Sequence, residues 1–317
     1  MHPDDDFHPP TSDDPFWSET CWFAFSVPER RLSGWFYPFF RPNLGVCSAA
    51  VFLWDDHGDQ PWNCRYFKQF WHLPMPEGPL SDCTIANGIR YRALESGKVY
   101  ELSYRDPDGD ELAIDLTFTA VMDALSTKSS GPAGGHLDQL GRFQGTIVLD
   151  GETIAVDSYG ARDRSWGSRS QFGQKLMSSG SYQATEMPYS HGTSDTRAFQ
   201  TITANVTDDY PLIMGFQICD GELSRLTSGR RAILERDAAT GGVTRVLIEG
   251  VDELGRELRA VGECMNRFTA YTNENLAGWN YLVRWDIDGV EAWGEQHENY
   301  SAWAIRKFAR AQQGWPA

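Results

Sequence analysis

Residues 145–158 read GTIVLDGETIAVDS, and this stretch indicates a β-hairpin. Apolar and polar side chains alternate on both sides of Asp150 and Gly151, and an Asp-Gly pair favours the tight turn between two antiparallel strands. Similar turn signals at residues 106–110, 220–221 and 288–289 separate further short alternating runs. Many short strands without alternating helices predict an all-β fold, either a barrel or a sandwich.

The chain has 317 residues, which is enough for two domains. Candidate strands are similarly numerous on either side of Gln171, so we predict two successive β-domains, residues 16–170 and 171–317. Residues 1–15 are acidic and rich in proline, and we expect a flexible lead-in there. Trp303, Ile305 and Phe308 have a rough helical spacing, which predicts a short C-terminal helix packed on a barrel.

The composition excludes several classes of partner. A formal net charge of −16 disfavours nucleic acid and anionic membranes. No window reaches the roughly 18 apolar residues that span a bilayer, and no secretion signal is visible. The six cysteines are scattered without a CxxC pair, which is typical of free thiols in a reducing compartment, so we expect a cytoplasmic protein.

Motifs for nucleotide binding and for serine or zinc hydrolysis are also missing. The sequence contains no GxGxxG after a strand, no P-loop lysine motif, no GxSxG and no HExxH. We therefore predict no nucleotide cofactor and no metal site. Ser165 lacks the strand–elbow–helix context of a nucleophile.

Residues 157–169, DSYGARDRSWGSR, place charges of both signs beside large aromatic residues. Such groups are costly to bury unless they are paired, so this cluster indicates either a structural ion-pair network or a functional site. Asp163 is the candidate acid or base, and strand alternation puts Arg162 and Arg164 on the opposite face. The alternative is a structural ion pair between Asp163 and Arg164 or Arg169.

His136 is the second candidate for proton transfer, because histidine titrates near neutral pH. Asp138 could orient its ring, and Gln139 could donate a hydrogen bond to a substrate oxygen. The alternative is that all three are ordinary polar residues of a loop and a strand start.

Near the C-terminus, strand alternation places Trp293, Glu295 and His297 on one face. They could contact a substrate, or Glu295 and His297 could bind a metal ion together with His136. The alternative is an outward polar face or a polar belt at the domain junction. His191 is expected in a surface loop.

Three segments carry a resemblance to a known family: residues 134–146 (GGHLDQLGRFQGT), 157–169 and 289–298 (GVEAWGEQHE). The chain resembles the AttH/CrtC-like family, which includes carotenoid 1,2-hydratases, kievitone hydratase and fungal Diels–Alderases. The resemblance extends from about residue 16 to about residue 300. It implies two lipocalin-like β-domains in tandem, with the site near their junction.

The resemblance also implies roles for individual residues. Asp163 matches the aspartate that protonates an alkene in the hydratases, and His136 matches an upstream histidine of the pocket. The chain departs from the hydratases at Ala161, where they have tyrosine, and at Asp138, where they have an aromatic residue.

The expected function is that of a cofactor-independent lyase or isomerase: a hydratase, dehydratase, cyclase or double-bond isomerase. Its substrate would be a hydrophobic small molecule, such as an isoprenoid, steroid-like or aromatic metabolite, and the protein is a possible homodimer. Asp163 and His136 would perform the acid–base chemistry. The candidate substrate contacts are Asp138, Gln139, Arg142, Tyr159, Arg164, Trp166, Trp293, Glu295 and His297. A non-catalytic carrier of a lipophilic ligand is the alternative.

Overall fold

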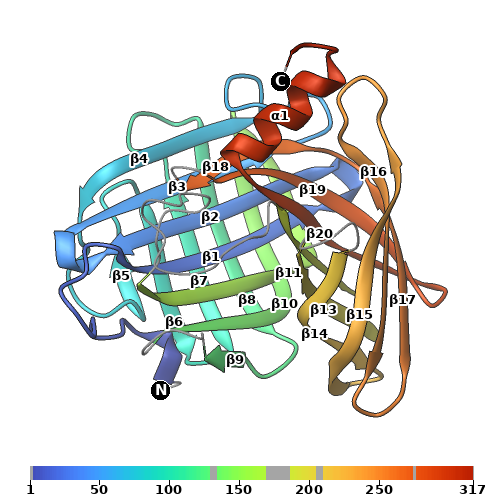
Figure 1. Ribbon diagram of the computed structural model, residues 1–317. Coiled ribbons are helices and arrows are strands. Elements are labelled where there is room, and N and C mark those ends of the chain that lie inside the picture. Colours follow the sequence, from blue (N-terminus) through green and yellow to red (C-terminus); the bar gives the residue numbers. More distant parts are fainter. Residues whose placement is uncertain (1–2, 129–133, 169–185, 205–209, 274–275, 317) are drawn as a thin grey trace. The chain divides into compact units, whose positions relative to one another are not determined.

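The computed structural model describes residues 3–128, 134–168, 186–204, 210–273 and 276–316 (Figure 1). These residues form β-strands, short turns and one C-terminal α-helix, which confirms the predicted all-β fold. The chain divides into two compact units, residues 1–53 with 65–169 and residues 54–64 with 170–317. The short segment 54–64 thus belongs to the second unit, although it lies within the first domain that the sequence predicts. Gln171 lies outside the described residues.

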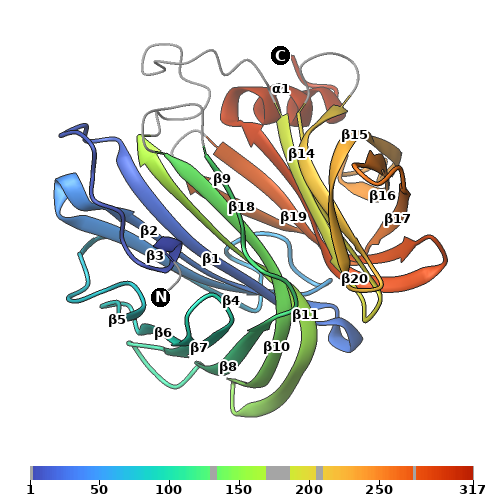
Figure 2. The same cartoon turned by 90° about the horizontal axis from the view of Figure 1, so that it is seen from below.

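The first unit contains an antiparallel sheet whose described strands follow the order β4-β3-β2-β1-β11-β10-β8-β7-β6-β5, with β9 paired to β10. The sheet curves into a half-barrel (Figure 2). Its strands are β1 (Trp17–Val27), β2 (Leu32–Arg41), β3 (Val46–Trp54), β4 (Tyr66–Pro74), β5 (Asp82–Thr84), β6 (Ile89–Glu95), β7 (Val99–Arg105), β8 (Leu112–Ala120), β9 (Leu125–Lys128), β10 (Gly135–Leu149) and β11 (Glu152–Ser168).

The second unit contains a closed barrel. Its strands follow the order β17-β16-β15-β14-β13-β12-β20-β19-β18 among the described residues, and a further pairing of β17 with β19 closes an eight-stranded ring. The strands are β12 (Glu186–Thr193), β13 (Arg197–Thr203), β14 (Tyr210–Cys219), β15 (Glu222–Arg236), β16 (Val243–Asp252), β17 (Glu257–Cys264), β18 (Phe268–Asn273), β19 (Leu276–Ile287) and β20 (Val290–Ser301).

The predicted Asp-Gly turns join hairpins in both units. Asp150 and Gly151 connect β10 to β11 with φ angles of 50° and 79°. The pairs at residues 220–221 and 288–289 have the same left-handed conformation and connect β14 to β15 and β19 to β20. Two consecutive positive φ angles match the twist of antiparallel strands, which explains why the same residue pair recurs at these turns.

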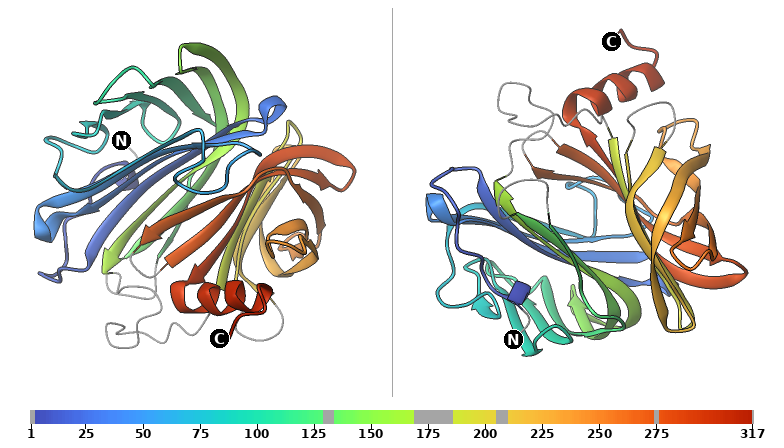
Figure 3. Two further views of the ribbon diagram at one scale, coloured as in Figure 1. Left: turned by 90° about the horizontal axis from the view of Figure 1, so that it is seen from above. Right: turned by 60° about the horizontal axis from the view of Figure 1, so that its bottom comes forward.

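The C-terminal helix α1 (Ala302–Gln312) lies beside β19 and β20 (Figure 3). Ile305 and Phe308 pack against the core of the second unit, as their spacing predicted. Trp303, however, is 43% exposed, with the Lys307 ammonium over its ring. In the described parts of the chain, no helix has the length and apolar character needed to cross a membrane.

The interior of the second unit holds a buried charge network. Arg231 is wholly buried, with Nη2 2.8 Å from Glu298 Oε1 and Nη1 3.4 Å from Glu186 Oε1. Burial and the nearby Glu298 carboxylate raise the pKa of Glu186 to about 7. Because a buried ion needs a partner, each member of this network depends on the others.

The N-terminal segment differs from the expected flexible lead-in at residues 3–8. Residues Pro3–Asp5 form a 3-10 turn inside the curve of the first unit's sheet (Figure 2). The Asp5 side chain is completely buried. An acidic, Pro-rich composition suggested flexibility, but here the Asp5 carboxylate pairs with the buried Arg162, and the backbone carbonyls of Asp4 and Asp6 accept hydrogen bonds from the buried Arg164. Residues 3–8 are therefore a packed part of the first unit.

Candidate functional site

Strands β10 and β11 present two polar faces with different environments. The register places Asp138 opposite Asp163 and His136 opposite Ser165, so these four residues share one face of the sheet. Arg162 and Arg164 point to the other face, as alternation predicted, and there they contact the N-terminal segment. Arg162 and Arg164, the sequence neighbours of Asp163, thus bind residues on the opposite face of the sheet.

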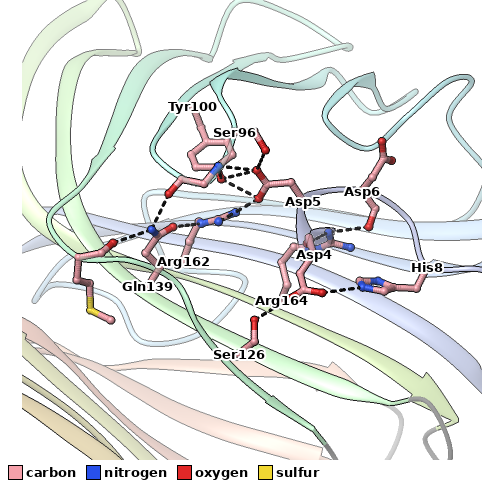
Figure 4. A network of polar contacts seen from close by, with 12 residues as sticks. Asp4, Asp5, Asp6, His8, Ser96, Tyr100, Ser126, Gln139, Arg162 and Arg164 are labelled. Atoms are coloured by element: carbon pink, nitrogen blue, oxygen red, sulfur yellow. Dashed lines mark hydrogen bonds and ion pairs between the residues drawn. The ribbon is translucent and has the colours of Figure 1, made fainter. Parts of the chain in front are cut away.

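Asp5 and Arg162 form a fully buried ion pair at 3.1 Å (Figure 4). The Asp5 carboxylate also accepts hydrogen bonds from the Ser96 and Tyr100 hydroxyls and from the Gly97 amide. Burial alone would raise the pKa of Asp5, but Arg162 and these hydrogen bonds outweigh it, so the pKa lies below its usual value. The ion pair and the hydrogen bonds to Asp5 therefore offset the cost of burying the two charges.

Arg164 is held in the same way. Its Nη2 lies 2.7 Å from Glu19 Oε2, and its Nη1 donates to the backbone carbonyls of Asp4 and Asp6. The His8 ring bonds Glu19 and stacks on Trp166 with 4.0 Å between ring centroids. In Figure 4, residues 4–8 of the N-terminal segment lie next to Arg162 and Arg164.

Gln139 also belongs to this inner network. Its Oε1 accepts a 2.6 Å hydrogen bond from Arg162 Nε, and its Nε2 donates to the carbonyls of Gly97 and Met122. Gln139, Arg164 and Trp166 were candidate substrate contacts, and the structure places all three on the face away from Asp163.

On the opposite face, His136 lies between two carboxylates. Its Nε2 is 2.9 Å from Asp138 Oδ2, and its Nδ1 is 2.8 Å from Ser165 Oγ and 3.9 Å from Asp163 Oδ2. The His136 and Asp163 side chains are about one-fifth exposed, whereas Asp138 is buried. Like charges directly across a strand pair are destabilising, so the Asp138–Asp163 pair favours a cationic group between them.

The same side chains have the spacing of a cation site. The donor atoms of His136, Asp138 and Asp163 lie within 4.8 Å of one another, and imidazole and carboxylate groups ligate divalent ions. This set differs from the combination of His136 with Glu295 and His297 considered above. Asp55, Asp56 and His57 form a second group with this spacing in the described part of the chain.

Arg142 and Tyr159 lie opposite each other on the same two strands, four residue pairs beyond Asp138 and Asp163. The Arg142 side chain is 46% exposed, with Nε 2.5 Å from Asp157 and its guanidinium 5.9 Å from the Tyr159 ring centroid. They lie on the same face of the sheet as the acid–base cluster, farther along β10 and β11.

The second unit holds another histidine–carboxylate pair. His297 Nε2 is 2.7 Å from Glu295 Oε2, and the His297 ring stacks on Tyr189 at 5.3 Å. Trp293 lies on the same strand face, as predicted, and donates from its indole to Glu291. His191, expected in a surface loop, is completely buried in β12.

Comparison with known proteins places the chain in a family. Residues 2–299 match the family described as Domain of unknown function (DUF7064). The protein belongs to this family. No curated protein matches the sequence.

Three solved structures share the fold of this DUF7064 protein. The putative AttH from Nitrosomonas europaea has 14% identity and a TM-score of 0.56, with 90% of this chain and 92% of that chain covered. CghA has 11% identity and a TM-score of 0.57, covering 93% and 94%. Kievitone hydratase from Nectria haematococca has 10% identity and a TM-score of 0.55, covering 92% and 91%. The resemblance to the AttH/CrtC-like family is thereby confirmed for the fold.

The buried His297 predicts a pH-dependent stability of the DUF7064 protein. Burial lowers its pKa to about 3 from the ordinary 6.5, so the folded state binds fewer protons than the unfolded state between these values. Stability should therefore fall as the pH drops below 6.5, by about 1.4 kcal/mol for each pH unit. We expect His297→Gln to flatten this slope in urea unfolding between pH 7 and pH 5.

The control for this experiment is His57→Gln, because the His57 side chain is 85% exposed. It should keep the wild-type slope. An unchanged slope in His297→Gln would show that the neighbouring Glu295 carboxylate offsets the effect of burial.

Proposed function

We propose that this protein is an enzyme that transfers protons to and from a hydrophobic small molecule, as a lyase or isomerase. The observation that supports the proposal best is the His136 imidazole, bonded to Asp138 and near a second carboxylate, Asp163. General acid–base catalysis needs such groups within hydrogen-bond reach of one another and partly open to a substrate.

The hydrogen bonds suggest a role for each group. Asp138 is buried and accepts from His136 Nε2, so it orients the ring and keeps a proton on that nitrogen. Asp163 is more exposed and can give a proton to a substrate carbon or remove one. His136 Nδ1, which faces both Asp163 and Ser165, can then restore the proton balance of the carboxyl group.

The same groups can run the reaction in either direction. For hydration, a proton from Asp163 adds to an alkene carbon, water adds to the neighbouring carbon, and the proton that this water loses returns to the cluster. Dehydration reverses these steps, and a double-bond shift needs only one proton added and another removed. The fold shared with kievitone hydratase supports a hydro-lyase within this range.

Isotope incorporation tests the proposal. Protein purified from its host would be extracted with organic solvent to recover any bound lipophile, which is then incubated with fresh protein in heavy water. Kievitone would be offered in parallel, because a protein of the same fold is named for its hydration. We expect deuterium on a substrate carbon by mass spectrometry.

A carrier would behave differently. The extracted lipophile would be retained through purification, identified in a native mass spectrum, and returned without deuterium after long incubation. That result would replace the enzyme proposal with the alternative of a non-catalytic ligand carrier.

A further inference from the structure

The inner face of the first unit's sheet carries a group of hydrogen-bond donors around a single carboxylate. Arg162 of β11 and Tyr100 of β7 contact Asp5 from two strands. The Ser96 hydroxyl and the Gly97 amide donate to the same carboxylate from the turn between β6 and β7. All of these residues belong to the first unit, and Figure 4 shows Asp5 next to Ser96, Tyr100 and Arg162. One guanidinium and several neutral donors are also what a carboxylate ligand requires.

Asp5 leaves part of this donor group unused. Arg162 Nη2 lies 3.1 Å from Asp5 Oδ1, whereas the buried Nη1 has no hydrogen-bond partner among the described residues. The buried Tyr91 hydroxyl, whose ring stacks on Tyr100 with 5.6 Å between centroids, has no such partner either. An arginine binds a carboxylate best through two parallel hydrogen bonds. A carboxylate that is not tied to the backbone can turn to bond both terminal nitrogens of Arg162.

The charges on this face match a ligand with one negative charge. Arg164, the other fully buried arginine of β11, is already paired with Glu19 at 2.7 Å, and the Gln139 amide that accepts from Arg162 Nε is neutral. A buried guanidinium stays charged and needs a counter-ion. Without Asp5, Arg162 would therefore favour a monocarboxylate over a neutral molecule of the same shape.

Aromatic rings surround the donors. The Tyr100 ring centroid lies 6.1 Å from that of Phe23 and 6.0 Å from that of Phe118, and the Arg162 guanidinium lies 4.2 Å from the Tyr100 centroid. Ligand sites of this kind combine apolar walls with a few polar groups that fix the orientation of the ligand. The body of a ligand held here by its carboxylate is therefore expected to be apolar.

The N-terminal segment carries the same chemical groups as such a ligand. Asp5 supplies the carboxylate, and Phe7 supplies a benzene ring that packs edge-on against Phe40 at 5.0 Å and joins the apolar core. Residues 3–8 belong to no strand of the sheet, and the exposed residues 9–13 separate them from β1. Displacing the segment would therefore break side-chain contacts but no strand pairing.

We propose that the inner face of the first unit's sheet binds an aromatic monocarboxylic acid, whose carboxylate bonds Arg162, Tyr100 and Gly97 in the place of Asp5. Residues 3–8 are then an internal competitor, which lowers the apparent affinity for the acid by occupying the site. The acid–base cluster lies on the other face of β10 and β11, so binding of the acid does not depend on the proposed function.

Isothermal titration calorimetry with 3-phenylpropionate and the neutral 3-phenylpropanamide tests the proposal. Asp5→Asn keeps the shape of the competitor but removes its charge, so this variant should bind the acid roughly tenfold more tightly than the wild type or better. The amide should bind the variant roughly tenfold more weakly than the acid, because it cannot form an ion pair with Arg162. Asp13→Asn, at an exposed position of the same stretch, is the control and should bind both probes as the wild type does.

Asp5→Ala gives a second readout, because the bound acid would supply the missing counter-ion of Arg162. The midpoint of its urea unfolding should rise with the concentration of 3-phenylpropionate and stay constant with the amide. Equal effects of the two probes, or no tighter binding in Asp5→Asn than in the wild type, would overturn the proposal. Residues 3–8 would then be a permanent part of the core.

The double variant Asp5→Ala/Arg162→Met locates the bound acid. It removes both members of the buried ion pair, so it should be at least as stable as Asp5→Ala. In this variant the acid and the amide should bind equally weakly. The backbone amide signal of Gly97 should also move in nuclear magnetic resonance spectra when the acid is added to Asp5→Asn. A preference for the acid that survives in the double variant would place the binding elsewhere and overturn the proposal.

Discussion

Asp5→Ala is expected to destabilise the protein by about 3–5 kcal/mol, the cost of breaking a buried ion pair by removing one partner. Both side chains of the Asp5–Arg162 pair are fully buried, and Arg162 would keep its charge after the substitution. The Ser96 and Tyr100 hydroxyls and the Gly97 amide would lose the same acceptor. Urea unfolding, followed by hydrogen exchange in β11, would measure the loss in the first unit.

Two further variants distinguish the contribution of the Asp5 charge from the contribution of the N-terminal segment as a whole. Asp5→Asn keeps an acceptor for the hydroxyls and removes only the charge, so its loss should be smaller than that of Asp5→Ala. Asp13→Ala, at an exposed position of the same N-terminal stretch, should have no measurable effect. Equal stabilities for Asp5→Ala and Asp13→Ala would show that Arg162 finds another partner, and residues 3–8 would then be dispensable.

Most of the site in the first unit could be predicted from the sequence. The Asp150-Gly151 turn fixes the register of β10 and β11, because residues equally far from the turn must pair. Counting outward from it places Asp138 opposite Asp163 and His136 opposite Ser165. Ser165 was set aside as a nucleophile, but the same count would have found it as the hydroxyl next to His136.

Other features depend on contacts that no local pattern shows. Asp5 and Arg162 are 157 positions apart, and an acidic, Pro-rich segment looks like a linker until its buried partner is known. All residues of β12 except Met187 are buried, so it lacks the alternation that identifies a half-buried strand. His191 was therefore assigned to a surface loop. Local sequence predicts hairpins and strand faces well, whereas burial on both faces is set by distant parts of the chain.

The largest effect on activity is expected from the acid–base cluster of the first unit. Under the proposed function, Asp163→Asn and His136→Gln should each lower kcat/KM for deuterium incorporation by about 10²–10⁴-fold, the usual contribution of a general acid or base. Both side chains are partly exposed, asparagine keeps the shape of aspartate, and glutamine keeps a polar side chain at position 136, so circular dichroism and the unfolding midpoint should stay near those of the wild type.

Asp115→Asn is the matched control, because Asp115 is a strand aspartate of the same unit whose side chain is 58% exposed and paired with Arg105. It should retain full activity. Ser165→Ala should lose less than either main variant but shift the pH profile, because the hydroxyl bonds His136 Nδ1 without facing the substrate carbon in the proposed mechanism.

The double variant Asp163→Asn/His136→Gln distinguishes a shared proton path from two independent contributions. Groups that act as a unit are strongly non-additive, so removing both should cost little more than removing one. Additive losses would mean that each residue contacts the substrate separately. Full activity in Asp163→Asn would remove the carboxyl group from the mechanism altogether, because no proton could then pass between it and His136.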